Sequence, residues 1–352
     1  MSSEDTPRRS PDPLGMFTRH AFVVLILVAG ALFLWQIADV LLLAFTGVLL
    51  AVFFRGLASL ISRYVPISVG WALPLVAIML ITIIVLFVLL AGPSINKQFS
   101  QLTETLPNSV DQVRQLLSQY SWAQYMYEQM TPKEWSASRS LNLFSRITGA
   151  ASSAFTVITN IIIIVSTAIY FSINPDSYKH GIVLLAPRSK SARVAEALEM
   201  SAHVLRKWLI GKAVAMLFVG VATWFGLWLI DVPLAFLLGI VSGLLDFVPY
   251  LGPIAAAVPA VLIALTAGWT TASYAVLVFV IVQQLEANVI TPIAQREAAS
   301  LPPALVVLAV VAFGLVFGLL GILIATPLTV VALVFIRMLY VEDVLGKSTK
   351  RA

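Results

Sequence analysis

The most restrictive feature of this chain is a break inside one of its longest apolar stretches. Residues 233–268 are almost wholly apolar, but near their centre stands Asp246-Phe247-Val248-Pro249-Tyr250-Leu251-Gly252-Pro253. Each proline removes a backbone donor and clashes with the preceding helical turn. In lipid, an interrupted backbone is tolerated only where protein or a water-filled cavity surrounds it. An acid at such a break is therefore a candidate functional site.

The composition is that of a membrane protein. Of the 352 residues, 60% are hydrophobic and 11% are charged, whereas soluble domains carry about 25% charged residues. The chain has no cysteine, and its three histidines lie in polar segments, which argues against thiolate and zinc sites. The net charge of +5 requires no nucleic-acid partner, because basic residues flank membrane spans. We expect no cofactor and no metal.

The apolar runs predict an all-α polytopic membrane protein with about six full spans. The first two runs meet at Ala38 and Asp39, which predicts a tight helical hairpin with Asp39 in its loop. A third span, beginning near residue 69, is expected to end at Gly92-Pro93. Lys212 lies one turn into the fifth span, and snorkelling to the interface is favoured over a role in substrate binding.

Residues 94–148 form the longest polar segment, and their balanced charge is typical of an outside loop. An apolar residue recurs every three or four positions, from Ile95 through Phe99 and Leu102 to Tyr120, which predicts helices, divided at Pro107. One interpretation is a stripe packed on the same subunit or lying in the membrane interface. The other is a contact between subunits, because the spacing is close to a heptad.

Two apolar runs are too long for one straight crossing. Residues 233–268 would extend roughly 54 Å as a single helix, and the hydrocarbon core is about 30 Å thick. Residues 304–336 are also long and contain Gly314, Gly318, Gly321 and Pro327. Charge topology favours two interrupted, re-entrant helical hairpins from opposite faces over two long tilted or kinked helices. Such paired interruptions are typical of a transporter binding site.

A second polar cluster stands late in the span that follows. Gln283, Gln284, Glu286 and Asn288 fall within six residues, and Thr291-Pro292 comes after them. One interpretation is a span end at the cytoplasmic interface, where polar residues are tolerated. The density of amides and acid favours the other, a buried cluster facing Asp246.

At these residues the chain resembles the AI-2E family of transporters. Asp246–Pro253 looks like the family's acid-x-x-Pro-Tyr-x-Gly-Pro motif, and Gln284–Pro292 resembles its Gln-x-Glu-Asn segment, with Ala287 inserted between acid and amide. Gly318 and Gly321 with Pro327 match its late glycine pair and proline. The likeness covers roughly residues 20–340. Ile293 departs from the family's usual lysine, and Pro302-Pro303 departs from its His-Pro.

The resemblance implies a secondary transporter that moves a small solute or ion and is linked to Na⁺ or H⁺, since members of the family include antiporters. It also implies a position in a cell (inner or plasma) membrane and assembly as a homo-oligomer. Both termini are expected in the cytoplasm. The chain has no HExxH, GxSxG or phosphate-loop motif, so we expect no enzyme. The alternative is a non-catalytic scaffold or sensor that assembles through residues 94–148.

The expected parts are therefore a disordered cytoplasmic tail (1–19), a membrane hairpin and third span (20–93), an extracytoplasmic amphipathic segment (94–148), a transport core (149–340) and a cytoplasmic tail (341–352). Within the core, the expected substrate- or ion-binding residues are Asp246, Pro249, Tyr250, Gly252, Pro253, Gln283, Gln284, Glu286, Asn288 and Pro292.

Overall fold

The computed structural model describes residues 22–117 (apart from 23, 24, 27, 31 and 34), 151–294 and 302–347. Within these ranges every regular element is a helix, which confirms the prediction of an all-α polytopic membrane protein. The tail 1–19, residues 118–148 and the end of the C-terminal tail lie outside the described residues. The stretches long and apolar enough to cross a membrane, among those described, are Ala38–Tyr64, Gly70–Thr103, Ser191–Leu229, Trp269–Ile293 and Pro303–Glu342. The number of full crossings stays a prediction.

Helix α2 (Ala38–Tyr64) does not form the expected tight hairpin with the apolar run before it. Ile37 N donates to Phe33 O (3.1 Å), and Leu41 N donates to Ile37 O (3.0 Å). The backbone therefore remains helical through Ile37, with a local distortion in place of a reversal. Asp39 lies in the first turn of α2 instead of a loop. An acid is favourable there, because a helix N-terminus carries partial positive charge.

Helix α3 (Val69–Leu117) passes through Gly92-Pro93, where the sequence predicts a helix end. A proline inside a helix costs about 3 kcal/mol, but the turns beyond it pack on the rest of the chain. Leu102 is buried in a cluster with residues of four later helices. Gln98 Oε1 accepts a hydrogen bond from Leu237 N (3.1 Å). The expected apolar stripe therefore begins as a same-chain contact, and Tyr120 lies outside the described residues.

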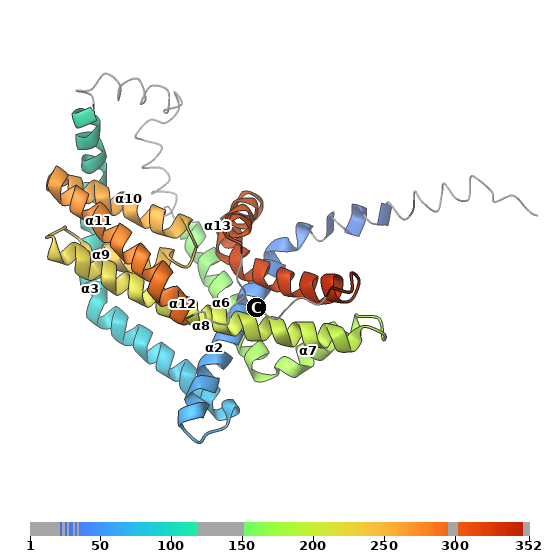
Figure 1. Ribbon diagram of the computed structural model, residues 1–352. Helices are drawn as coiled ribbons and strands as arrows, with labels where there is room; N and C mark the ends of the chain where they lie inside the picture. Colours follow the sequence, from blue (N-terminus) through green and yellow to red (C-terminus); the bar gives the residue numbers. More distant parts are fainter. Residues whose placement is uncertain are drawn as a thin grey trace, which may run out of the picture.

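Three helices then follow: α6 (Ala151–Ile173), α7 (Pro175–Leu184) and α8 (Ser191–Leu229). α6 packs along α2, where Arg55 Nη1 donates to the backbone oxygen of Ser172 (2.7 Å). The polar residues before the fifth span and the span itself form one uninterrupted helix, α8. Figure 1 shows α8 as the long yellow-green helix crossing the molecule, and it contacts α2, α7, α9, α11 and α13.

Residues 233–268 fold into α9 (Ala235–Leu245) and α10 (Leu251–Thr266). Residues at the start of α9 and the end of α10 share one buried cluster, which requires the two helices to run antiparallel. At 1.5 Å per residue they are roughly 16 and 24 Å long, so each is shorter than the hydrocarbon core of about 30 Å. The first interrupted run is therefore a helical hairpin. Its entry side relative to a membrane stays a prediction.

After the hairpin, α11 (Trp269–Leu285) packs on α10 and α8. It continues into a π-helical turn, η1 (Glu286–Ile290), and a short helix, α12 (Thr291–Ala294). The second polar cluster thus stands where regular α-helical hydrogen bonding changes. Such π-helical turns occur frequently at functional sites.

The second interrupted run, α13 (Pro303–Phe335), folds back at Gly318, whose φ is 62° and ψ is −142°. A Cβ added to Gly321 would lie 2.1 Å from the backbone oxygen of Phe313, although eight residues of straight helix extend about 12 Å. Positive φ at Gly318 is a conformation that glycine adopts without steric penalty. This run is therefore also a hairpin, with arms at 303–317 and 319–335.

The tip of the first hairpin packs against the arms of the second. Val248, in the α9–α10 connection, is buried in a cluster with Val306, Val310 and Ala325 from both arms of α13. Its neighbour Phe247 packs into a separate cluster together with Phe317 and residues of α2 and α8. The contact places the interruption near Asp246 against the middle of the second hairpin. A last helical segment, η2 (Ile336–Glu342), extends the second hairpin.

Candidate functional site

Helices α8 and α9 cross closely and antiparallel, and glycines allow the approach. A Cβ on Gly239 would lie 2.7 Å from the backbone oxygen of Gly220, and one on Gly243 would lie 2.7 Å from that of Met216. A step of one turn forward along α9 therefore corresponds to a step of one turn back along α8. The same register brings residue 246 opposite residue 212.

Lys212 and Asp246 form a buried ion pair at that position. Lys212 Nζ donates to Asp246 Oδ2 over 2.8 Å. The two side chains are only 7% and 3% exposed. Ionised side chains are almost never buried to this extent unless they are paired. The acid in the hairpin tip is thus balanced by a cation from the neighbouring long helix.

The backbone of the tip is shaped by the other motif residues. Tyr250 has a φ of 64°, and a Cβ on Gly252 would lie 1.8 Å from Leu245 O, so only glycine fits that close approach. Pro253 falls in the first turn of α10, where a missing N–H leaves no helical bond unmade. Leu251 N donates to Pro249 O (2.8 Å). These residues fix the course of the chain around Asp246, whereas a binding role for them remains a prediction.

The residues of the second polar cluster bond to one another. Thr291 Oγ1 donates to Glu286 Oε1 (2.7 Å) across the π-helical turn. Asn288 Nδ2 donates to the Oε1 of Gln284 (2.8 Å). Glu286 and Gln283 are half-buried, whereas Gln284 and Asn288 are exposed. η1 packs beside α8, but the ion-pair partner of Asp246 is Lys212 rather than a residue of this cluster.

Aromatic and aliphatic side chains enclose the ion pair. Phe247 meets Trp208 edge to face, with ring centroids 5.9 Å apart, and Trp208 lies about one turn before Lys212 on α8. On the other side of Asp246, Ser242 is 1% exposed, and its backbone oxygen accepts from Asp246 N (3.0 Å). The pair therefore sits in an apolar, tightly packed setting between α8 and the hairpin tip.

Lys212 is the functional candidate that sequence reasoning underestimated. Snorkelling predicts an ammonium group at the interface, but the residue is 6% exposed and turned to Asp246. One signal could have identified it: Lys212 is the only lysine or arginine between residues 209 and 295. An acid within that apolar stretch needs a counter-charge, so Lys212 was the nearest candidate in sequence.

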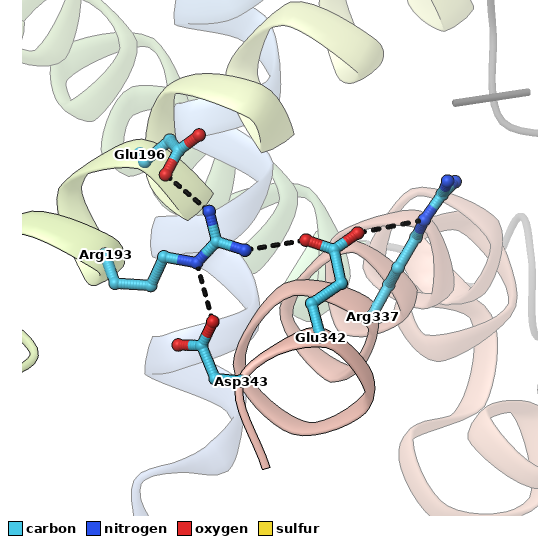
Figure 2. Close-up of polar contacts among 5 residues, drawn as sticks. All are labelled: Arg193, Glu196, Arg337, Glu342 and Asp343. Carbon is cyan, nitrogen blue, oxygen red and sulfur yellow. Dashed lines mark hydrogen bonds and ion pairs between the residues drawn. The ribbon is translucent and has the colours of Figure 1, made fainter. Parts of the chain in front are cut away.

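A different charged cluster joins the start of α8 to the end of the second hairpin (Figure 2). Arg193 donates from Nη1 to Glu196 (2.6 Å), from Nη2 to Glu342 (2.6 Å) and from Nε to Asp343 (3.0 Å). Arg337 Nε lies 3.7 Å from the other carboxylate oxygen of Glu342. We call these five residues the Arg193 cluster. No group of three or more potential metal-ligating side chains occurs in the described part of the chain.

Comparisons with known proteins agree on one family. The model of the AI-2E family transporters matches residues 22–340. YueF of Bacillus subtilis (strain 168), whose name provisionally describes a transport protein, is 30% identical over 256 residues, or 69% of each chain. The AI-2 transport protein TqsA of Escherichia coli (strain K12) is 24% identical over 287 residues, or 78% of this chain and 81% of TqsA.

The match runs from the first apolar run into η2 and includes both hairpins, the ion pair and the polar cluster. The relatives are named for transport and not for a reaction. The apolar helices and this family together make the protein a multi-pass membrane protein. The chain belongs to the AI-2E family of transporters.

Proposed function

We propose that this protein is a secondary transporter that moves a small solute or ion, and that Asp246 is its ion- or proton-linked carboxylate. The observation that carries the proposal is the position of Asp246: it is 2% exposed and lies in the connection of one hairpin, where Val248 packs against both arms of another. Opposed hairpins with interrupted backbones are a recurrent way to build a transport site.

Stability alone does not account for the buried pair. Burying two charges in a medium of low dielectric constant costs about as much as their attraction returns, so an apolar pair of similar volume is often as stable. A charged pair retained within apolar helices therefore supports a role in which charge itself is used. Binding of a proton or Na⁺ at a carboxylate is such a role.

The remaining expected residues have supporting parts in this proposal. Pro249, Tyr250, Gly252 and Pro253 hold the connection open at Asp246, and the N-terminus of α10 and the C-terminus of α9 add partial charges there. Gln283, Gln284, Glu286 and Asn288 form a polar wall next to α8, and Pro292 ends it. These amides and the acid are suited to bind hydrogen-bonding solutes during transport.

The wider setting is part of the same proposal. Residues 149–340 act as the transport core, residues 94–148 lie outside the cytoplasm, and both tails lie in it. The protein acts as a homo-oligomer in the cell membrane and exchanges its solute against Na⁺ or H⁺. These statements rest on the charge distribution along the chain and on the family.

Flux through proteoliposomes tests the role of Asp246. Purified protein is reconstituted, and ²²Na⁺ uptake and the signal of a trapped pH-sensitive dye are followed under imposed Na⁺ or pH gradients. Asp246→Asn is expected to abolish the flux, because the amide has nearly the same shape but cannot carry the charge. Asp231→Asn is the matched control, since Asp231 is exposed in the α8–α9 loop.

Folding of both variants is checked by circular dichroism and size-exclusion chromatography. Wild-type flux in Asp246→Asn would overturn the assignment of Asp246, whereas a wild-type protein without any flux would favour the scaffold or sensor alternative. A wild-type protein that couples to neither gradient would overturn ion coupling itself.

A further inference from the structure

The strongest feature that the proposed function leaves unexplained is the ammonium group of Lys212, which already pairs with Asp246. Lys212 Nζ lies 2.8 Å from Oδ2, which is the position where an incoming Na⁺ or proton would be bound. The carboxylate therefore cannot keep this contact and accept a second cation at the same oxygen. Occupancy of Oδ2 by Lys212 and its occupancy by the coupled ion exclude one another.

We propose that Lys212 is the resident counter-ion of Asp246 and that the coupled cation binds by displacing it. The inference rests on the proposed function, and it makes Lys212 the residue that sets cation affinity. In the state described here the site is charge-neutral without any bound ion. In the loaded state Na⁺ or H⁺ neutralises Asp246, and the ammonium group withdraws.

The helices of the two hairpins and α11 supply no second positive charge that could pair with Asp246. Helices α9, α10, α11 and α13, taken between their bounds, contain no Asp, Glu, Lys or Arg. The nearest other charges in sequence are His203, Arg206 and Lys207 on α8, and η1 contributes Glu286. The charged residues of α2 are Arg55, which bonds the backbone oxygen of Ser172, and Asp39 and Arg63 near the ends of the helix. Within their bounds, α9, α10 and α13 therefore contain no basic side chain that could replace Lys212 as the partner of Asp246.

The chemistry of lysine suits a displaceable partner. Its ammonium group is a compact charge on a flexible stem of four methylenes, so it can leave one contact without moving the backbone. The stem can withdraw along α8, toward the end that carries Arg206 and Lys207. An arginine would bind the carboxylate through two parallel bonds in a fixed fork, which a monovalent ion displaces less readily.

Lys212→Gln separates this role from a structural one. Without its competitor, Asp246 should bind the coupled ion more tightly, so the Na⁺ or H⁺ concentration for half-maximal flux should fall by about tenfold or more. Lys212→Arg should raise that concentration. A purely structural lysine would lower the maximal flux and the yield in both variants and leave the half-maximal concentration unchanged. Lys190→Gln is the control, because Lys190 is exposed before α8.

A measurement on the wild-type protein avoids any folding defect of the variants. Acetic anhydride labelling followed by mass spectrometry reports how accessible the Lys212 amine is. Labelling should increase when Na⁺ replaces N-methyl-D-glucamine, or when the pH falls if the ion is a proton, relative to labelling of Lys190. If the extent of Lys212 labelling changes with neither Na⁺ nor pH, the inference is overturned. If Asp246→Asn also abolishes flux, the proposed function stands and only the displacement is rejected.

Discussion

Helix α8 carries two clusters of charge that differ in burial. At its start, Arg193 contacts three carboxylates, and its side chain is 28% exposed. Further along, Lys212 contacts Asp246 alone, and its side chain is 7% exposed. Each cluster connects α8 to one hairpin: the Arg193 cluster to η2 and Asp343 after α13, and Lys212 to the tip between α9 and α10.

The difference shows that the number of ion pairs is a poor guide to their role. Partly exposed pairs contribute about 0–1 kcal/mol each and weaken with salt. A buried pair adds little net stability, but losing one partner leaves an uncompensated charge. The Arg193 cluster is therefore suited to hold two segments together, and the buried pair is suited to respond to an ion.

The largest expected effect is the loss of one buried partner. Lys212→Met should destabilise the protein by about 3–5 kcal/mol, because Asp246 is left unpaired. The double change Lys212→Met with Asp246→Leu should recover most of that loss, since it removes both charges together. Unfolding in detergent micelles, followed by circular dichroism at constant salt, measures both. A double variant as unstable as the single one would show that packing, and not charge, is responsible.

A smaller effect is expected at the crossing that sets the register of the pair. Gly243→Ala would place a Cβ 2.7 Å from Met216 O and 3.0 Å from Gly220 Cα. Overpacking of this kind costs about 1–3 kcal/mol. Gly92→Ala is the control, because its Cβ would approach no closer than 3.8 Å to a neighbouring side chain. Thermal unfolding of the two variants should therefore differ, and equal melting temperatures would mean that α8 and α9 separate easily.

The smallest effect is expected from the partly exposed cluster. Arg193→Met should lower stability by about 1–2 kcal/mol in dilute buffer, because three screened contacts are lost. That loss should shrink in about 1 M salt, where the screening length is about 3 Å. Melting curves at low and high salt compare the variant with wild type. A loss as large as that of Lys212→Met, and independent of salt, would remove the distinction between the clusters.

Local sequence rules recovered the hairpins because local chemistry determines them. Pro249, Gly252 and Pro253 together disfavour a continuous helix, and Gly318 permits a reversal that other residues resist. The same rules failed at Gly92-Pro93, where the buried Leu102 and the hydrogen-bonded Gln98 hold α3 helical beyond the proline. Packing with distant residues outweighed the local signal.

The partner of Asp246 could not be derived in the same way. Lys212 is 34 residues away in sequence, and its position depends on the register of α8 and α9, which Gly220, Gly239 and Gly243 set together. GxxxG spacing predicts close packing but does not say which helix packs there. Charge balance within the apolar stretch would have indicated Lys212, whereas the geometry required the fold.

The crossing of α8 with the first hairpin also has a mechanical consequence. Counted from Gly220, α8 extends about 12 Å to Lys212 and about 40 Å to Arg193 at 1.5 Å per residue. If α8 tilts as a rigid rod about Gly220, a displacement of about 1 Å at the ion pair becomes a displacement of about 3 Å at Arg193. Arg193 forms ion pairs with Glu342 of η2 and with Asp343 after it. A small displacement of α8 at Asp246 would therefore become a larger displacement at the far end of the second hairpin.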